Sequence, residues 1–311
     1  MTKTAGILKK ITLYTLLTLI TLIATGYIYL YVLPKGPSIT PPTAMAIGTS
    51  SFVMYAYKDS KRKSIRTWTY RPKHWQNEDK ILFVMHGGGR NADDYLEAWK
   101  AIAESKNILI LAPEFENKFA KYTTNDYQEG NLFTFFGTKN PKEEWAYVVI
   151  ENIFDKIKAD NNLSNETYDI FGHSAGGQFV HRMIMLMPGA RVETAIAANA
   201  GFYTFPDESL DFPYGLKNTG VKMRTGTGEA FKKSLTILLG ELDNDPALGT
   251  FRTTDLAMKQ GQHRLGRGTK FYTMCKNLAS EHGFEFRWKI DTVMDVGHNY
   301  KKMSQNAASF L

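Results

Sequence analysis

The sequence predicts an α/β fold with a mostly parallel, doubly wound sheet and helices on both faces, preceded by one N-terminal transmembrane helix. Three observations carry this prediction. Short apolar runs alternate with longer runs of helical periodicity from about residue 47 to the C-terminus, which is typical of buried parallel strands joined by helices. An uncharged run near the N-terminus is long enough to cross a bilayer. The composition, 43% hydrophobic and 22% charged, is that of an ordinary globular protein.

The positive charge of the chain is concentrated at its N-terminus. The formal net charge is +7, but four lysines and no acidic residue lie in residues 1–35, which leaves 34 basic and 31 acidic residues elsewhere. A domain with such mixed charges lacks the concentrated basic face that nucleic-acid binding needs, so we expect no nucleic-acid partner. The single cysteine, Cys275, excludes an intramolecular disulfide and a cysteine metal cluster. Its helical surroundings favour a half-buried structural thiol over a nucleophile.

The N-terminal segment predicts a signal-anchor. Residues 11–33 form an uncharged run that would be about 34 Å long as a helix, enough to cross a hydrocarbon core of about 30 Å. Lys9 and Lys10 precede it, which favours a cytoplasmic location for residues 1–10 and places the rest on the periplasmic or extracellular side. A cleaved signal peptide, with secretion of the remainder, is the alternative. It is less favoured because the run exceeds a usual signal core and Ala24-Thr25-Gly26 is a poor cleavage site. A buried soluble helix is a third interpretation.

Residues 34–46 contain four prolines and predict a short extended linker to a folded domain over residues 47–311. Within this domain, apolar runs predict strands at residues 51–58, 64–71, 81–85, 108–111, 168–171, 195–198, 235–239 and 286–290. Helical spacing predicts helices at residues 92–105, 141–160, 177–187 and 271–282, with Pro141 in the first turn of the second.

Two long connections, residues 114–140 and 201–234, show no clear pattern. Both follow expected strand ends, where open α/β sheets bind their ligands. Arg264 and Arg267 are interpreted as part of a solvated basic loop, with steering of an anionic substrate as the alternative. Aromatic residues in the two connections either form an apolar ligand pocket or pack the loops onto the core: Phe133, Phe135, Phe136, Phe202, Tyr203, Phe205, Phe212 and Tyr214.

The strongest motif is Gly-His-Ser-Ala-Gly-Gly at residues 172–177, between an expected strand and an expected helix. Gly-x-Ser-x-Gly in this setting is the nucleophile-elbow pattern. Side chains two residues on either side of the serine would collide with neighbouring backbone, and the glycines relieve that crowding. The turn lifts the serine oxygen above the sheet, where the helix N-terminus points N–H groups at it. We therefore predict that Ser174 is a nucleophile, rather than part of a purely structural turn.

A second glycine-rich run, His-Gly-Gly-Gly at residues 86–89, follows the expected strand 81–85. Its glycines let backbone N–H groups approach a substrate, and a loop in this place completes an oxyanion hole with the residue after the nucleophile. We assign the backbone N–H groups of Gly88 and Ala175 to this hole, with Gly87 or Gly89 as alternatives to Gly88. His86 is interpreted as a structural histidine.

An acidic partner is expected at the end of a later strand. Residues 240–246, Gly-Glu-Leu-Asp-Asn-Asp-Pro, follow the expected strand 235–239. Asp243 is the predicted acid because it lies nearest to the rigid strand end. Asp245 is the second choice and Glu241 the third.

The general base is expected near the C-terminus. His298 follows the last expected strand, which fits the chain order Ser, Asp, His. His173 and His181 are too close to Ser174 in sequence to turn back onto it. The remaining histidines precede the serine or lie in helical or basic segments: His74, His86, His263 and His282.

With the order Ser174, Asp243, His298 and the upstream glycine-rich run, the chain from about residue 81 onward resembles the α/β-hydrolase superfamily. Several stretches resemble bacterial extracytoplasmic esterases of the polyhydroxybutyrate-depolymerase or feruloyl-esterase type: residues 85–99, 169–182, 198–204 and 238–243.

The resemblance implies a serine hydrolase that cleaves carboxylic esters through an acyl-enzyme intermediate, with no metal or cofactor. It also implies that His298 takes the proton of Ser174, Asp243 orients His298, and Gly88 and Ala175 hold the oxyanion. The expected partners are a small-molecule or oligomeric ester and a membrane. Peptidase, thioesterase or amidase activity on the same triad is the alternative. An inactive membrane-tethered binding protein is a further one, against which the complete set of three residues argues.

Overall fold

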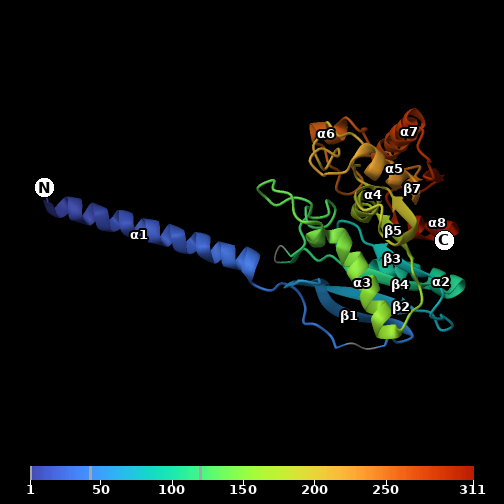
Figure 1. The fold of residues 1–311 in the computed structure, drawn as a ribbon, viewed down its shortest axis with the longest axis horizontal. Helices are drawn as coiled ribbons and strands as arrows, with labels where there is room; N and C mark the ends of the chain where they lie inside the picture. Colours follow the sequence, from blue (N-terminus) through green and yellow to red (C-terminus); the bar gives the residue numbers. More distant parts are fainter. Residues whose placement is uncertain (1, 42–43, 119–120) are drawn as a thin grey trace.

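The computed structural model describes residues 2–41, 44–118 and 121–311. Its centre is an eight-stranded sheet, whose strands are β1 (Gly48–Tyr57), β2 (Ser60–Arg71), β3 (Ile81–Met85), β4 (Leu109–Glu114), β5 (Tyr168–His173), β6 (Val192–Ala198), β7 (Ser234–Gly240) and β8 (Lys289–Val293). They lie in the order β1-β2-β4-β3-β5-β6-β7-β8 (Figure 1). β1 and β2 are antiparallel, β2 is antiparallel to β4, and β3 to β8 run parallel to one another. The predicted class, a mostly parallel α/β sheet, is therefore confirmed.

Helices cover both faces of this sheet, as predicted. The main helices are α2 (Ala92–Lys106), α3 (Ala146–Asn161), α4 (Ala175–Leu186), α7 (Arg264–His282) and α8 (Tyr300–Ala307), with the short helices α5 (Gly228–Phe231) and α6 (Asp255–Met258) between them. On β3, Leu82 and Val84 belong to the core cluster on the side of α2 and α8, whereas Phe83 and Met85 belong to the cluster on the side of α3, α4 and α7. Each of these strand side chains is fully buried, and burying one contributes about 1.5–3 kcal/mol.

Two elements near the C-terminus are placed differently from the prediction. β8 lies three residues later than expected, because Phe286 and Trp288 pack edge-on against Phe231 in an irregular segment ahead of it. α7 begins seven residues earlier than expected. His263 caps it, since its ring nitrogen accepts a hydrogen bond from the Gly266 N–H at 3.1 Å.

The helix expected from residue 141 is divided. Pro141 precedes a short 3₁₀ turn, η3 (Lys142–Glu144), and α3 starts only at Ala146. The apolar side chains of Val149, Ile153 and Ile157 on α3 are buried.

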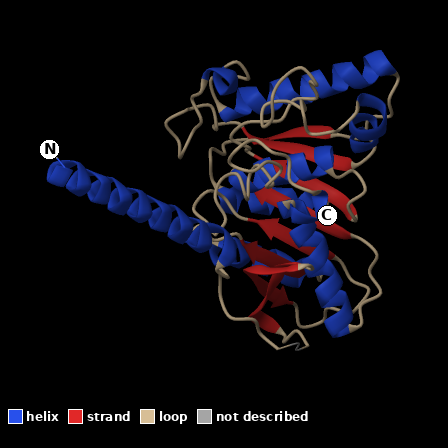
Figure 2. Cartoon of the chain, turned by 60° about the vertical axis from the view of Figure 1, so that its left-hand side comes forward, coloured by secondary structure: helices blue, strands red, loops and turns tan. Residues whose placement is uncertain are grey.

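The N-terminal segment is one long helix. α1 (Thr2–Tyr27) continues into the π-helical turn η1 (Ile28–Val32) and leaves the domain as a rod (Figures 1 and 2). Residues 6–27 are long and apolar enough to cross a membrane, and none of that window is buried. Four threonine hydroxyls along the helix each donate to the carbonyl four residues earlier, at 2.9–3.0 Å: Thr12, Thr15, Thr18 and Thr21. The helix therefore satisfies these polar groups internally, as a bilayer requires.

The chain packs onto the domain directly after η1. The Lys35 N–H donates to the Arg62 carbonyl at 2.7 Å, and the Ser64 N–H donates to the Lys35 carbonyl at 3.0 Å. Further along, the Thr40 N–H donates to Val53, and Met45 is buried. The described part of residues 34–46 is thus fixed along the sheet, so residue 47 is not where packing on the domain begins.

This contact lies at the edge of the sheet where the parallel strands end. Arg66 of β2 pairs with Glu114, the last residue of β4. Since β2 runs antiparallel to β4, Arg62 and Ser64 lie beyond the carboxyl end of β4. The first residues after the apolar helix therefore meet the domain at the carboxyl edge of the sheet.

Candidate active site

Ser174 occupies a tight turn between β5 and α4. Its backbone adopts φ 58° and ψ −114°, a strained conformation for a residue with a side chain. A Cβ at Gly172 would overlap the Gly176 carbonyl, and a Cβ at Gly176 would overlap the Met85 carbonyl of β3. The two glycines therefore let the turn form against the neighbouring strand. The serine side chain is left partly exposed at the carboxyl edge of the sheet.

His298 faces Ser174 from the loop between β8 and α8. Its Nε2 lies 3.0 Å from the Ser174 hydroxyl oxygen. Its side chain is 14% exposed, so most of the ring is held by the protein. Asn299, the next residue, caps α8 by accepting hydrogen bonds from the Lys301 and Lys302 N–H groups, which fixes the end of this loop.

Asp243 contacts the other side of the same imidazole. Its Oδ2 lies 2.7 Å from His298 Nδ1, and the carboxylate is fully buried. Asp245 is exposed and accepts a hydrogen bond from the Ala247 N–H, while Glu241 accepts one from Asp295 N–H. The structure thus brings Ser174, His298 and Asp243 together in one hydrogen-bonded chain and leaves the other two carboxylates outside it.

A buried arginine stands behind the acid. Arg264 Nη1 lies 3.3 Å from Asp243 Oδ1 and also donates to the Leu248 carbonyl at 2.7 Å. Its side chain and that of Arg267 are at most 1% exposed. Both predicted roles, a solvated loop and substrate steering, were therefore wrong for these two residues. No pattern in the sequence signals this ion pair, because Arg264 lies 21 residues after Asp243.

Asn199 was also missed. It follows β6 with φ 46° and is fully buried. Its Oδ1 accepts a hydrogen bond from Gly240 N–H at 2.7 Å, and its Nδ2 donates to the Gly297 carbonyl at 3.2 Å. Asn199 therefore links the strand end that carries the acid to the loop that carries the histidine.

His173, beside the serine, packs against the base. Its ring centroid lies 4.6 Å from that of His298, and its Nδ1 lies 3.0 Å from the Tyr95 hydroxyl. Burial, and then the proximity of His298, lower the pKa of His173 well below its usual range. His173 is thus a neutral ring that supports His298 from one face.

The glycine-rich loop after β3 lies next to the elbow. A Cβ at Gly87 would lie 3.6 Å from the Ser174 Cβ and closer still to the Tyr95 hydroxyl. Gly88 is exposed, with open space around it. This places the loop where an oxyanion hole is needed, and the donor role of Gly88 and Ala175 stays a prediction.

His86 is structural, as interpreted. Its Nε2 accepts a hydrogen bond from the Phe115 N–H at 3.0 Å, so its proton is on Nδ1, which donates to the Gly87 carbonyl at 2.9 Å. Burial lowers the pKa of His86 to about 3. The ring therefore holds the start of the glycine loop and carries no charge near neutral pH.

The aromatic residues of the two long connections divide into two groups. Four of the eight pack the loops onto the domain and are buried: Phe202, Tyr203, Phe205 and Tyr214. Phe133 and Phe212 contact each other at 5.8 Å between ring centroids. Phe135 and Phe136, by contrast, are 89% and 85% exposed. A pocket made by all eight residues is not formed.

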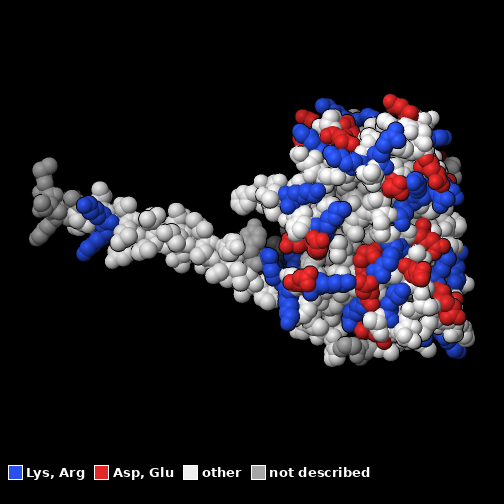
Figure 3. Space-filling model, viewed as in Figure 1, with Lys and Arg blue, Asp and Glu red and all other residues white. Residues whose placement is uncertain are grey.

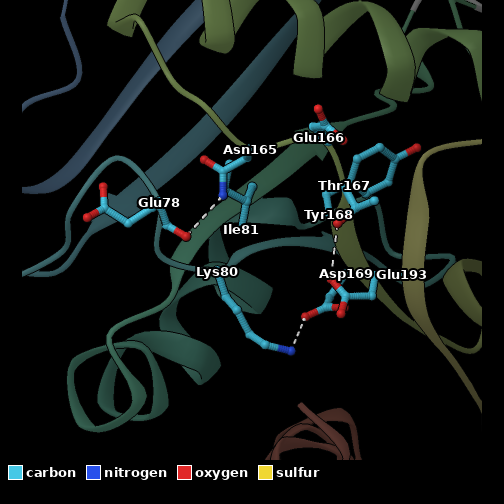
Figure 4. Close-up of a pocket in the computed structure, with 9 residues that line it drawn as sticks. All are labelled: Glu78, Lys80, Ile81, Asn165, Glu166, Thr167, Tyr168, Asp169 and Glu193. Atoms are coloured by element: carbon cyan, nitrogen blue, oxygen red, sulfur yellow. Dashed lines mark hydrogen bonds and ion pairs between the residues drawn. The ribbon is translucent and has the colours of Figure 1, made fainter.

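A surface cavity lies away from Ser174. It has a volume of about 230 Å³ and is lined by Ile81 and Tyr168, the first residues of two parallel strands, so it opens at the amino edge of the sheet. Lys80 and Asp169 form an ion pair across it at 3.1 Å (Figure 4). Among the described residues, no group of three His, Cys, Asp or Glu side chains is placed to hold a metal ion. Basic and acidic side chains alternate over the face of the domain seen in Figure 3.

This sheet, with an elbow serine after its central strand β5 and a histidine loop after its last strand, has the architecture of an α/β-hydrolase. The chain is 39% identical to poly(aspartic acid) hydrolase-1 from Sphingomonas sp. KT-1, covering 85% of this chain and 98% of that one, with a TM-score of 0.81. It is 30% identical to LpqC, a poly(3-hydroxybutyrate) depolymerase from Bordetella parapertussis, covering 85% and 89%, also with a TM-score of 0.81. The chain belongs to the family of α/β-hydrolase enzymes that contains these two proteins.

More distant structures share the fold alone. An S-formylglutathione hydrolase from Agrobacterium tumefaciens is 13% identical, with 88% of this chain and 97% of that one covered and a TM-score of 0.54. No protein-family model matches the chain, and no curated protein sequence does.

Proposed function

We propose that this chain is a serine hydrolase that cleaves carboxylic esters, with Ser174, His298 and Asp243 as its catalytic triad. The observation that carries the proposal is the hydrogen-bonded chain of these three side chains, at 3.0 Å and 2.7 Å, on an elbow turn. Membership of a hydrolase family supports it. The expected substrate is a small-molecule or oligomeric ester.

In the first half of the reaction, Ser174 Oγ attacks the acyl carbonyl carbon while His298 Nε2 takes the hydroxyl proton. The imidazolium that forms donates through Nδ1–H to the Asp243 carboxylate, which fixes the tautomer and stabilises the positive charge. Arg264 holds the other oxygen of this carboxylate, so the acid is kept in one orientation. His298 then gives its proton to the leaving alcohol oxygen, and an acyl-enzyme remains.

In the second half, water attacks the acyl-enzyme carbonyl and His298 takes a proton from it. Collapse of the intermediate releases the acid and returns the proton to Ser174. In both halves the carbonyl oxygen becomes an oxyanion, for which we propose the backbone N–H groups of Gly88 and Ala175. Loss of one such donor typically costs about 10²–10³ in turnover. Ala175 is the first residue of α4, so the positive end of that helix dipole also faces the oxyanion.

Amide hydrolysis is the second candidate. One relative is named for poly(aspartic acid), a polyamide, and the other for poly(3-hydroxybutyrate), a polyester. The same triad serves either bond, since His298 would protonate a leaving nitrogen as it does a leaving oxygen. Only the relative rates on matched substrates separate the two candidates.

The test uses p-nitrophenyl esters of varied acyl length beside p-nitroanilides of the same acyl groups, together with both polymers. We expect kcat/KM to be higher on the esters and to depend on acyl length. Faster cleavage of the anilides and of poly(aspartic acid) would instead establish an amidase. The matched control is Ser174→Ala, which should lose labelling by a fluorophosphonate probe and about 10⁴ in turnover while keeping its melting curve. Full labelling of this variant would overturn the assignment of the nucleophile.

We also propose that residues 11–33 are an uncleaved anchor, with residues 1–10 in the cytoplasm and the domain on the periplasmic or extracellular side. The exposure of residues 6–27 and the internal hydrogen bonds of the helix threonines support a lipid environment. Lys9 and Lys10 support the orientation. Intact-mass measurement of the mature protein from its host membrane, with protease protection of residues 1–10, tests this. A mature chain that begins after residue 26 would show a cleaved signal instead.

A further inference from the structure

Two exposed aromatic side chains form the tip of a projecting loop between β4 and α3. Phe135 and Phe136 lie edge to face, with ring centroids 5.4 Å apart, and are far more exposed than the other phenylalanines that the structure describes. Large apolar side chains that stay in water without a partner usually mark an interaction site. This pair has no role in the proposed reaction.

The loop is a defined hairpin, so the tip is presented at a fixed place. Phe133 and Lys139 form an antiparallel bridge, and the Thr134 N–H donates to the Thr138 carbonyl at 2.8 Å. The base is held as well, because the Phe133 ring contacts Phe212 and Lys139 donates to the Thr219 carbonyl. We refer to residues 133–139 as the aromatic hairpin.

The aromatic hairpin projects on the side of the domain from which α1 leaves (Figure 1). It belongs to the connection after β4, and therefore to the carboxyl edge of the sheet. The segment after α1 reaches the same edge through the backbone pairing of Lys35 with Arg62 and Ser64. An ion pair of Lys63 with Asp126, at 3.0 Å, links this part of β2 to the connection that carries the hairpin, because Asp126 lies in that connection. Figure 3 shows the hairpin side as an uncharged projection beside the apolar helix.

We infer that the aromatic hairpin inserts Phe135 and Phe136 into the headgroup and acyl-chain boundary of the bilayer that α1 crosses. Phenylalanine is among the apolar residues that bury at the boundary of headgroups and acyl chains, and the anchor keeps the tip next to the membrane at all times. The domain would thus rest on the membrane at two points, its apolar helix and this hairpin, with the carboxyl edge of the sheet and Ser174 turned toward the lipid. The inference relies on the anchor proposed above.

The structure provides a selective labelling scheme to test this contact in the full-length chain. Cys275, the only cysteine, is fully buried, so an environment-sensitive fluorophore will attach to a newly introduced exposed cysteine. Three single variants are compared in lipid nanodiscs: Phe135→Cys on the hairpin, Leu22→Cys in α1, and Ile47→Cys. Ile47 is the matched control because it is an apolar residue, 62% exposed, next to the opposite edge of the sheet.

The measurement is the fluorophore emission maximum and its quenching by lipids brominated at shallow or deep acyl positions. We expect position 135 to show a blue-shifted emission quenched mainly by shallow bromines, position 22 to be quenched mainly by deep bromines, and position 47 to behave as in water. Labelling of Ser174 by a fluorophosphonate confirms that each variant is folded. Emission at position 135 as water-like as at position 47, with position 22 quenched, would overturn the hairpin contact and leave the anchor intact.

The remaining outcomes are also decisive. A blue-shifted position 135 without lipid quenching would mean that the hairpin contacts protein, such as a second copy of the chain, and would overturn the inference. Quenching at position 135 but not at position 22 would support the hairpin contact and reject the anchor. Absence of quenching at both positions would reject both.

Discussion

Replacing Asp243 by asparagine tests the acid and its buried surroundings in one variant. The amide is close to the carboxylate in shape, so it alters charge and hydrogen bonding with little change in packing. The asparagine side chain could accept a weak hydrogen bond from His298 Nδ1–H, or it could donate its NH₂ to Nδ1. In the second case the imidazole proton is on Nε2. That nitrogen can then no longer take the hydroxyl proton of Ser174. Loss of the orienting carboxylate in this way costs about 10⁴ in turnover in serine proteases, and we expect the same magnitude here.

The structure adds a second expected effect, on stability. Asp243 Oδ1 is the carboxylate partner of Arg264, and both side chains are at most 1% exposed. Removing one partner of a buried ion pair typically costs about 3–5 kcal/mol, because a buried charge is left uncompensated. The amide oxygen still accepts from Arg264, so we expect the lower limit, about 3 kcal/mol, and a melting temperature lower by about 10 °C.

The assay measures the turnover number on one p-nitrophenyl ester together with urea unfolding of the same samples, at a temperature where the variant is fully folded. Asp245→Asn is the matched control. Asp245 is exposed, and its carboxylate accepts a hydrogen bond from the Ala247 N–H, so its replacement should change turnover by less than about tenfold and stability by about 0.5 kcal/mol or less. A turnover of Asp243→Asn within about tenfold of the wild type, or a severe loss in Asp245→Asn alone, would refute the assignment.

Three further predictions concern stability and reactivity. The free energy of unfolding should be roughly 2–4 kcal/mol lower for a chain that starts at Ile47 than for one that starts at Lys35, because the shorter chain lacks the pairing with β2 and buried Met45. Equal urea midpoints of the two chains would contradict this. Burial lowers the pKa of His86, His173 and His181, so below a pH of about 6.5 the unfolded chain binds protons that the folded chain does not. The free energy of unfolding should then fall by about 1.4 kcal/mol per pH unit for each histidine as the pH decreases. A free energy of unfolding, measured with urea, that stays constant between about pH 7 and pH 5 would count against this prediction. Burial also raises the pKa of the Cys275 thiol, so a thiol reagent should react with it only after denaturation, and rapid reaction of the native protein would disprove its burial.

The parts of the fold that sequence alone predicted are those fixed by short-range patterns. The elbow at Ser174 needs glycine on both sides for local steric reasons, and the fully apolar strands cannot be anything but buried. Boundaries failed where a long-range contact or a cap decides them. The cap at His263 makes α7 begin before the residues whose spacing predicted the helix. The packing of Trp288 on Phe231 keeps the chain irregular up to the first residue of β8.

The candidate site shows the same division. Ser174, Asp243 and His298 each follow a strand, so chain order and strand ends were enough to bring them together. Arg264 and Asn199 carry no motif, and their contacts with Asp243 and Gly297 arise from the tertiary fold. A buried charge also cannot be told from a solvated one by composition. For that reason Arg264 and Arg267 were assigned to a surface loop, although they lie in the interior.

Only Leu33 and Pro34 separate the end of η1 from Lys35, whose backbone is paired with β2. Two residues span at most about 7 Å, so the linker between the helix and the domain is very short. An enzyme on a long flexible stalk searches a hemisphere of solution above its anchor. The present enzyme, with its helix in the bilayer, would meet its substrate only by lateral diffusion in the membrane. Its encounter rate with an ester held in the same membrane would then scale with the number of molecules per unit of surface, whereas a soluble polymer would have to enter the thin layer between lipid and protein.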